Sequence, residues 1–352
     1  MELICPLCGL PLTIENKTCR CGNGHSFDVA RQGYIHLLPV QNKRSLHPGD
    51  TREQVLSRRE FLEAGFYQPI ADSLIQAAKD FSASGPVLDV GCGEGWYGSQ
   101  LATSIGAELV GFDISKEAVR CAAAKYKSAT WLCASAADIP VADGSAGLLT
   151  SLFALTMPEE FHRVLKENGL FFQVLAAQDH LLGLKSIIYP QLLLKEKDSV
   201  PDVPGFGLLE SRPIRFTFTV EGKQVQNLLS MTPHVYRISK EGAARLEATQ
   251  SLTDTASCVL NIYRKRYELY IWAKYWYNFI DINDSGAIPC WINCAALQAG
   301  TRSYASSPSS RIFITIPRRL LRFCGRKMTW SPLWMLTRPI TMPCGICVTH
   351  RN

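Results

Sequence analysis

Apolar and polar positions alternate in blocks between residues 86 and 178, and this pattern predicts an α/β sheet. Five short apolar runs are typical of buried strands: VLDV (87–90), ELVGF (108–112), ATWLC (129–133), GLLTSLF (147–153) and GLFFQVL (169–175). Helical patterns lie between them, in GWYGSQLATSI (95–105), KEAVRCAAAKY (116–126) and PEEFHRVLKE (158–167). The alternation predicts a parallel sheet with helices on both faces and a ligand above the carboxyl ends of the strands.

Residues 179–266 continue the apolar pattern with LLGLKSIIYPQLLLKE, RFTFTV and VQNLLSMTP. We expect them to finish the sheet and to cover its site.

A glycine turn follows the first strand, in the sequence VLDVGCGEG, with glycines at Gly91, Gly93 and Gly95. A strand, a tight glycine turn and a helix form the first unit of a nucleotide-binding sheet. Dinucleotide sites prefer G-x-G-x-x-G, whereas the spacing here is G-x-G-x-G, with Asp89 before it and Glu94 inside it. Acidic groups suit a cofactor that carries an ammonium and a sulfonium, so we favour S-adenosylmethionine over NAD or a turn without a ligand.

A second acid supports that interpretation. The segment GFDIS places Asp113 at the end of the next apolar run, about twenty residues further on. A carboxylate at this position can accept hydrogen bonds from both ribose hydroxyls of a nucleoside.

The composition indicates a cytoplasmic protein of one or two domains. The chain has 352 residues, 47% of them hydrophobic, and no uncharged apolar stretch of eighteen residues or N-terminal signal pattern is present. Thirteen cysteines without a secretion signal indicate free thiols or metal ligands.

The net charge of +6 is concentrated after residue 266, where ten basic and three acidic residues lie. The first 266 residues carry 27 basic and 28 acidic groups, so nucleic-acid binding there requires a local patch. Residues 267–352 keep no periodicity and hold a CxxC-x2-H cluster of Cys344, Cys347 and His350. We consider an RNA- or membrane-surface appendage, a small domain or out-of-frame translation, and favour the last.

The N-terminus carries a set of metal ligands. Cys5, Cys8, Cys21 and His25 have the spacing C-x2-C-x12-C-x3-H, which predicts a closed, structural zinc site. Cys19 is an alternative to Cys21 on spacing alone.

Six basic residues between the zinc ligands and the sheet form a modest cationic strip: Arg31, Lys43, Arg44, Arg52, Arg58 and Arg59. Tyr34 and His36 lie near them. The strip suits looped RNA, and a solvated helix face explains it equally well. The PGD at 48–50 predicts a turn, and Thr51 a helix N-cap.

These motifs together resemble the bacterial 23S rRNA (guanine-N1)-methyltransferases. The resemblance lies in CPLC…C…H.FD.AR.GY..LLP, PGD…RR.FL.AG.YQP, VLDVGCGEG.Y and MTPHVYR, and it covers about residues 2–266. It implies a class I, Rossmann-like methyltransferase sheet with an N-terminal zinc module, and a substrate guanine in a 23S rRNA hairpin loop. It also implies that the zinc module and a homodimer cleft hold the RNA.

The resemblance also implies roles for individual residues. It places the zinc on Cys5, Cys8, Cys21 and His25, which favours Cys21 over Cys19. It places cofactor contacts on Tyr67, Gly93, Glu94 and His180, the ribose acid on Asp113, and a serine beside the adenine at Ser135. With Asp89 and Gly91 from the glycine turn, these residues form the predicted cofactor site.

The chain departs from the family pattern around the expected methyl-acceptor pocket. Where the family has Ile-Tyr-Ala-Pro, this chain has SLFALTMPEE (151–160), so that Phe153 replaces the tyrosine. Gly147 replaces an acidic residue before it, and the loop before His180 is about two residues shorter. We therefore expect the cofactor site to follow the family more closely than the acceptor site.

Four segments and one reaction follow. We expect a zinc-binding RNA-recognition module at 1–36, a basic helical linker at 37–85, a methyltransferase domain at 86–266 and an anomalous tail at 267–352. The absence of an (Asn/Asp)-Pro-Pro-(Tyr/Phe) motif after the fourth strand agrees with methylation of a ring nitrogen. The alternatives are a small-molecule methyltransferase, and an RNA-binding or resistance factor with impaired turnover.

Overall fold

The computed structural model describes residues 1–39, 48–192 and 198–266, all of which fall in one compact unit, Met1–Tyr275. The predictions for the tail at 267–352, including the cluster of Cys344, Cys347 and His350, lie outside the described residues, as do Lys43 and Arg44.

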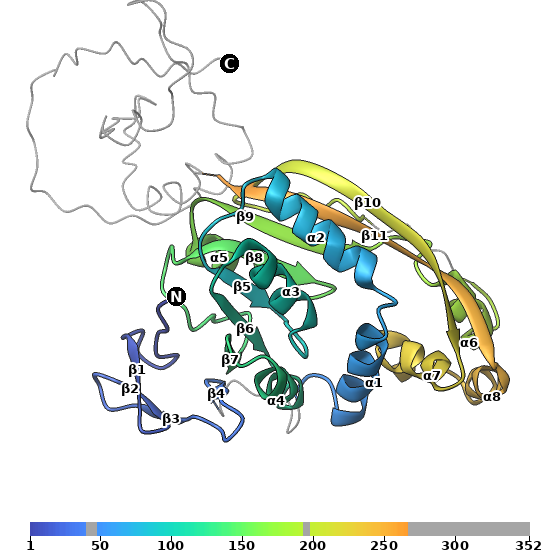
Figure 1. The fold of residues 1–352 in the computed structure, drawn as a ribbon, viewed down its shortest axis with the longest axis horizontal. Coiled ribbons are helices and arrows are strands. Elements are labelled where there is room, and N and C mark those ends of the chain that lie inside the picture. The colour runs from blue at the N-terminus through green and yellow to red at the C-terminus, as the bar shows by residue number, and fades with distance from the viewer. Residues whose placement is uncertain (40–47, 193–197, 267–352) are drawn as a thin grey trace, which may run out of the picture. The chain divides into compact units, whose positions relative to one another are not determined.

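An eight-stranded sheet forms the centre of this unit, in the order β10-β11-β9-β8-β5-β6-β7-β4 (Figure 1). The strands are β4 (Ile35–His36), β5 (Val87–Val90), β6 (Leu109–Asp113), β7 (Thr130–Cys133), β8 (Ala146–Leu152), β9 (Leu165–Ala176), β10 (Phe206–Glu221) and β11 (Ser251–Lys265). The strands from β4 to β9 pair in parallel, and β11 pairs antiparallel with both β9 and β10. The predicted α/β sheet is confirmed, and its last two strands make it mixed.

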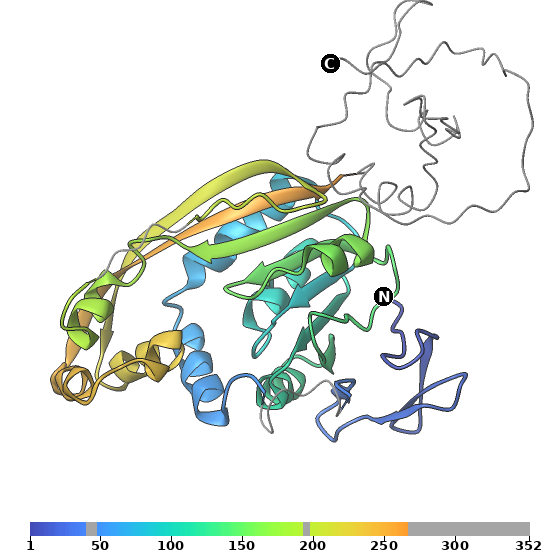
Figure 2. The same cartoon turned by 180° about the vertical axis from the view of Figure 1, so that it is seen from behind.

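Helices cover both faces of the sheet. They are α1 (Arg52–Glu63), α2 (Gln68–Asp80), α3 (Trp96–Ile105), α4 (Lys116–Lys125), α5 (Pro158–Val164), α6 (Leu182–Ile188), α7 (Lys223–Ser230) and α8 (Lys240–Ala248), with a 3-10 turn η2 (Pro233–Tyr236). One buried core joins α2, α3 and α4 to the sheet, and a second joins α5. Seen from behind, α5 lies in front of the central strands (Figure 2). This layering places the ends of the parallel strands at one edge, where the glycine turn lies.

The segment predicted as a linker contains α1 and α2, and both helices contribute to the core. The capping box at the start of α1 explains its sharp beginning, because Thr51 accepts a hydrogen bond from the Gln54 N–H and Gln54 reaches back to the Thr51 N–H. Thr51 is thus confirmed as the N-cap. The apolar positions of α1 and α2 are buried at helical spacing, so the two helices are held by packing.

Two elements differ from the sequence prediction. The helix expected over 158–167 ends at Val164, because Leu165 pairs with Ala146 and begins β9. Strand pairing and burial of Leu165 therefore outweigh the helical spacing. Ile35 and His36 pair with β7 and extend the sheet as β4, so the chain leaving the zinc ligands becomes an edge strand.

The described residues contain no helix that is both long enough and apolar enough to cross a membrane.

Gly147, which stands where the family pattern has an acidic residue, packs directly against the backbone of a neighbouring turn. A Cβ atom at this position would collide with the carbonyl oxygen of Ser84, so β8 approaches the 84–85 turn more closely than any side chain permits. We expect Gly147→Ala to lower the free energy of unfolding by about 1–3 kcal/mol, because the turn or the strand must shift. Chemical denaturation measures this, and an unchanged midpoint would show that the turn yields without cost.

Candidate functional site

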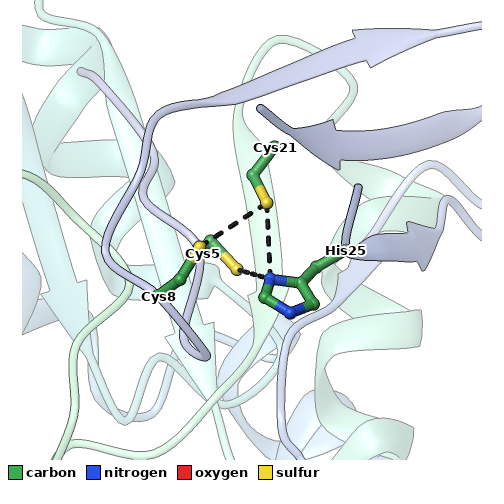
Figure 3. A group of neighbouring side chains, drawn as sticks. All are labelled: Cys5, Cys8, Cys21 and His25. Atoms are coloured by element: carbon green, nitrogen blue, oxygen red, sulfur yellow. Dashed lines mark hydrogen bonds between the residues drawn. The ribbon is translucent and has the colours of Figure 1, made fainter. Parts of the chain in front are cut away.

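The predicted zinc ligands meet in a small three-stranded sheet at the N-terminus, formed by β1 (Leu12–Glu15), β2 (Thr18–Cys21) and β3 (Ser26–Asp28). Cys5 and Cys8 lie on a tight knuckle in which the Gly9 N–H donates to the Cys5 carbonyl at 2.8 Å, and Gly9 has a φ of 72°. Cys21 ends β2, and His25 follows the next turn. The four ligand atoms lie within 4.8 Å of one another (Figure 3).

The spacing of these atoms fits a tetrahedral zinc ion. The Sγ atoms of Cys5 and Cys21 each lie 3.5 Å from Nδ1 of His25, and the Sγ atoms of Cys8 and Cys21 are 3.6 Å apart. Zinc–sulfur bonds of about 2.3 Å at tetrahedral angles require ligand separations of about 3.7 Å. Four protein ligands leave no open position, so the site is structural.

Cys19 lies outside the cluster. Its side chain is fully buried in the core that contains Ile35 and Leu37, and burial raises the pKa of its thiol. The structure thus answers the question that the spacing left open, in favour of Cys21.

The glycine turn between β5 and α3 has the geometry that its sequence predicts. Gly91, Gly93 and Gly95 have φ values of 67°, 56° and 79°, a region that favours glycine. A Cβ at Gly95 would collide with the Trp131 ring, and one at Gly91 would lie 2.8 Å from Ala154. A Cβ at Gly93 would meet, among the described residues, only Nη1 of Arg58 within 4 Å, at 3.4 Å, so this side of the turn is open to a close ligand.

Asp113 ties this turn to the end of β6. Its carboxylate accepts hydrogen bonds from the Gly93 N–H at 3.0 Å and from the Ser115 N–H at 2.8 Å. Burial raises the pKa of Asp113, and these two N–H groups and Arg58 oppose the shift. The carboxylate is half-buried beside the open part of the turn, which is compatible with the predicted ribose contact.

Asp89 lies behind the turn. Its side chain is 3% exposed and accepts a hydrogen bond from the Thr150 hydroxyl at 2.7 Å and one from the Gly98 N–H at the start of α3. Burial raises its pKa to about 7, against the effect of these two donors. Its contacts orient α3 relative to β8, so its predicted contribution to cofactor binding would act through the position of the turn.

Glu94 and Arg58 face each other above Gly93. The Glu94 side chain is 6% exposed, and its Oε2 has no hydrogen-bond partner within the described residues. Nη1 of Arg58 lies 4.0 Å from this oxygen, while Nη2 pairs with Asp50. Burial raises the pKa of Glu94 to about 7, and Arg58 opposes that shift.

Arg58 is the site residue that the sequence interpretation missed. It was counted with the cationic strip, yet it lies in α1 at helical spacing from the buried residues Val55, Phe61 and Leu62. That spacing was the available signal that Arg58 points inward. Arg59 pairs with Glu63 at 2.8 Å. Arg58 and Arg59, two of the six residues of the strip, are therefore engaged within the protein.

Tyr67 and His180 come together from α2 and from the loop after β9. The Tyr67 hydroxyl lies 3.5 Å from Nε2 of His180, and Nδ1 of His180 accepts a hydrogen bond from the Ser257 N–H at 3.1 Å. Because Nδ1 accepts, Nε2 of the neutral ring carries the proton and faces Tyr67. Burial raises the pKa of Tyr67 well above its usual range, so the phenol stays protonated.

Ser135 follows the end of β7, as predicted, and its hydroxyl accepts a hydrogen bond from the Ala137 N–H at 3.2 Å.

The segment that departs from the family pattern follows β8. Phe153 has a φ of 54°, is 45% exposed, and its ring centroid lies 6.1 Å from that of His180. Leu155 is 79% exposed, whereas Thr156 is held by a hydrogen bond from Gln173 at 2.7 Å. The segment is thus anchored at one end and offers apolar side chains beside His180.

Removing a single thiol tests the zinc site. We expect Cys21→Ala to abolish stoichiometric zinc binding and to lower stability, because metal binding supplies folding energy to so small a module. Cys19→Ala is the matched control and should keep its zinc. Metal content by mass spectrometry measures both, and loss of zinc in the Cys19 variant alone would contradict the assignment.

Known proteins match both modules. A zinc-ribbon family model described as "RlmA, N-terminal" matches residues 3–46, and one described as "Methyltransferase domain" matches residues 87–169. The chain is 32% identical over 254 residues to the "23S rRNA (guanine(748)-N(1))-methyltransferase" of Streptomyces fradiae, covering 69% of this chain and 89% of that protein. It is 28% identical over 262 residues to "Putative 23S rRNA (guanine-N(1)-)-methyltransferase YxjB" of Bacillus subtilis (strain 168), covering 70% and 91%. With its zinc ribbon and its methyltransferase sheet both accounted for, the chain belongs to the 23S rRNA (guanine-N1)-methyltransferase family.

Proposed function

We propose that the protein transfers the methyl group of S-adenosylmethionine to N1 of a guanine in a hairpin loop of 23S rRNA. The observation that carries this proposal is the relative of 32% identity, matched over 254 residues and 89% of its own length. The zinc-ribbon and methyltransferase family models, which match residues 3–46 and 87–169, support it. A small-molecule methyltransferase would have no need for the zinc ribbon. An RNA-binding or resistance factor with impaired turnover would bind the same RNA and donor but would leave the guanine unmethylated, and the primer-extension experiment below separates it from the enzyme.

The cofactor site of this proposal surrounds the glycine turn. It consists of the residues predicted from the sequence: Tyr67, Asp89, Gly91, Gly93, Glu94, Asp113, Ser135 and His180. The open backbone at Gly93 and the half-buried Asp113 beside it support the placement of a nucleoside there. The unpartnered oxygen of Glu94 supports a cationic ligand. When bound, S-adenosylmethionine supplies a methyl group made electrophilic by the sulfonium.

The protein's contribution to the chemistry is alignment of the acceptor nitrogen with the carbon–sulfur bond. Guanine N1 is protonated and paired in duplex RNA, so the base must be unpaired or flipped out of its stack. Phe153 offers apolar surface for such a base beside His180, and Leu155 in the same segment is also exposed. His180 does not take the N1 proton in this state, because its Nε2 already carries one.

We assign RNA contacts to the zinc module and to the surface around it, and the implied homodimer remains a prediction of the family resemblance. We propose a cytoplasmic location, because the proposed substrate is a ribosomal RNA.

Primer extension tests the proposed reaction. Incubation of the protein with S-adenosylmethionine and unmodified 23S rRNA should create a reverse-transcriptase stop at a hairpin-loop guanine, because an N1-methyl group blocks Watson–Crick pairing.

We expect Asp113→Ala to weaken donor binding by about 1–3 kcal/mol, as for hydrogen bonds lost in a partly buried site. Asp72→Ala, on the exposed face of α2, is the control. Identical stops with and without active protein would refute the rRNA methyltransferase proposal.

The pH dependence of donor binding should follow Glu94. A cationic donor binds the ionised carboxylate more tightly, and the pKa of Glu94 in the donor-free protein is about 7. Affinity for S-adenosylmethionine should therefore rise several-fold between pH 6 and 7.5, with release of a proton on binding. Calorimetry in buffers of different ionisation enthalpy measures both effects. Glu94→Gln should remove the dependence, and a persistent dependence in that variant would assign it to another group.

A further inference from the structure

Glu94 carries the least satisfied charge near the glycine turn. Its side chain is 6% exposed, and Oε2 has no hydrogen-bond partner within the described residues. Such an arrangement is costly, since a buried carboxylate needs hydrogen bonds or a close counter-charge. The nearest cation is Nη1 of Arg58 at 4.0 Å, which is too far for a hydrogen bond.

Arg58 is the cation nearest to this carboxylate and is itself only partly exposed. Its side chain is 24% exposed, one nitrogen pairs with Asp50, and the other lies over the open part of the turn at Gly93. The guanidinium is thus held by Asp50 and makes no hydrogen bond to Glu94. It also stands among three acids, because Asp113 adds to the negative potential at the guanidinium.

A purely structural ion pair explains this geometry less well. An arginine that joins α1 to the sheet for stability would be expected to donate hydrogen bonds to both carboxylates, as charge-assisted pairs do. Here the Arg58–Glu94 contact stops short of a hydrogen bond, and burial leaves the Glu94 carboxyl with a pKa of about 7. The pair is therefore suited to bind a ligand that carries one positively charged group and one negatively charged group.

We propose that Arg58 and Glu94 bind the zwitterionic amino-acid end of the methyl donor, with Arg58 donating to its α-carboxylate and Glu94 accepting from its α-ammonium. The inference rests on the donor site proposed above. The donor carries these two opposite charges on one carbon, and the protein presents their complements on either side of Gly93. The α-ammonium takes the place beside Glu94 that the guanidinium fills in the donor-free protein, and Arg58 shifts to meet the carboxylate.

The position of Asp113 agrees with this assignment. It accepts from the Gly93 N–H, so the predicted ribose contact and the amino-acid contacts lie on adjacent parts of one turn. Asp113 would then bind the ribose of the donor, and Glu94 would bind its α-ammonium.

Three ligands separate the two contacts by calorimetry: S-adenosylmethionine, its decarboxylated form, which keeps the ammonium and the sulfonium, and 5′-methylthioadenosine, a neutral thioether that lacks both the amino-acid end and the sulfonium charge. We expect Arg58→Gln to weaken binding of S-adenosylmethionine about tenfold or more, and to leave the other two within about twofold. Glu94→Gln should weaken both ammonium-bearing ligands and spare 5′-methylthioadenosine.

Arg59→Gln is the matched control, because Arg59 neighbours Arg58 but pairs with Glu63, which also pairs with Lys125 of α4. It should leave all three affinities unchanged. Arg58→Lys keeps the charge without the planar fork, so it should give a smaller, carboxylate-dependent loss and provides a second variant if Arg58→Gln does not fold.

Equal losses for all three ligands would overturn the proposal, since they would show that the pair shapes the turn or contacts the nucleoside. No loss for any ligand would overturn it as well. The readout is donor binding without RNA, so it stays separate from a failure of the rRNA proposal, which primer extension with the unaltered protein detects.

Discussion

The hydrogen bond from the Gly93 N–H to the Asp113 carboxylate is the contact on which the site depends. It joins the turn after β5 to the end of β6, two neighbouring strands whose parallel register places Val90 beside Phe112. Because parallel strands end at the same edge, a turn and an acid twenty residues apart in sequence become parts of one surface. Gly93 can make this contact only with a positive φ, which explains why glycine stands there.

Three acidic side chains surround one arginine near this contact. Asp50, Glu94 and Asp113 all influence Arg58, and burial raises the pKa values of Glu94 and Asp113. Asp89 has a different position, since protein donors satisfy it behind the turn. The two acids that flank the glycines in sequence therefore have different surroundings, one ordering α3 and the other facing Arg58.

The sequence predicted the central strands, the glycine turn and the zinc ligands because each is encoded by local spacing. The choice between Cys19 and Cys21 needed the three-dimensional structure, because both are buried on the same face of β2 and only Cys21 lies with Cys5, Cys8 and His25. The end of α5 was placed too late, since pairing of Leu165 with Ala146 depends on a distant strand. Arg58 was counted as surface charge, although its spacing from Val55 and Phe61 placed it on the buried face of α1.

The two-residue strand β4 joins the zinc module to the edge of the central sheet. It pairs with the outer edge of β7, and Leu3 forms an isolated bridge with Val141. The zinc module and the sheet therefore share backbone hydrogen bonds and part of one core. An uncovered strand edge is a template for pairing with other chains. Since β4 follows the zinc ligands in the chain, the segment that holds the metal also keeps the outer edge of β7 paired.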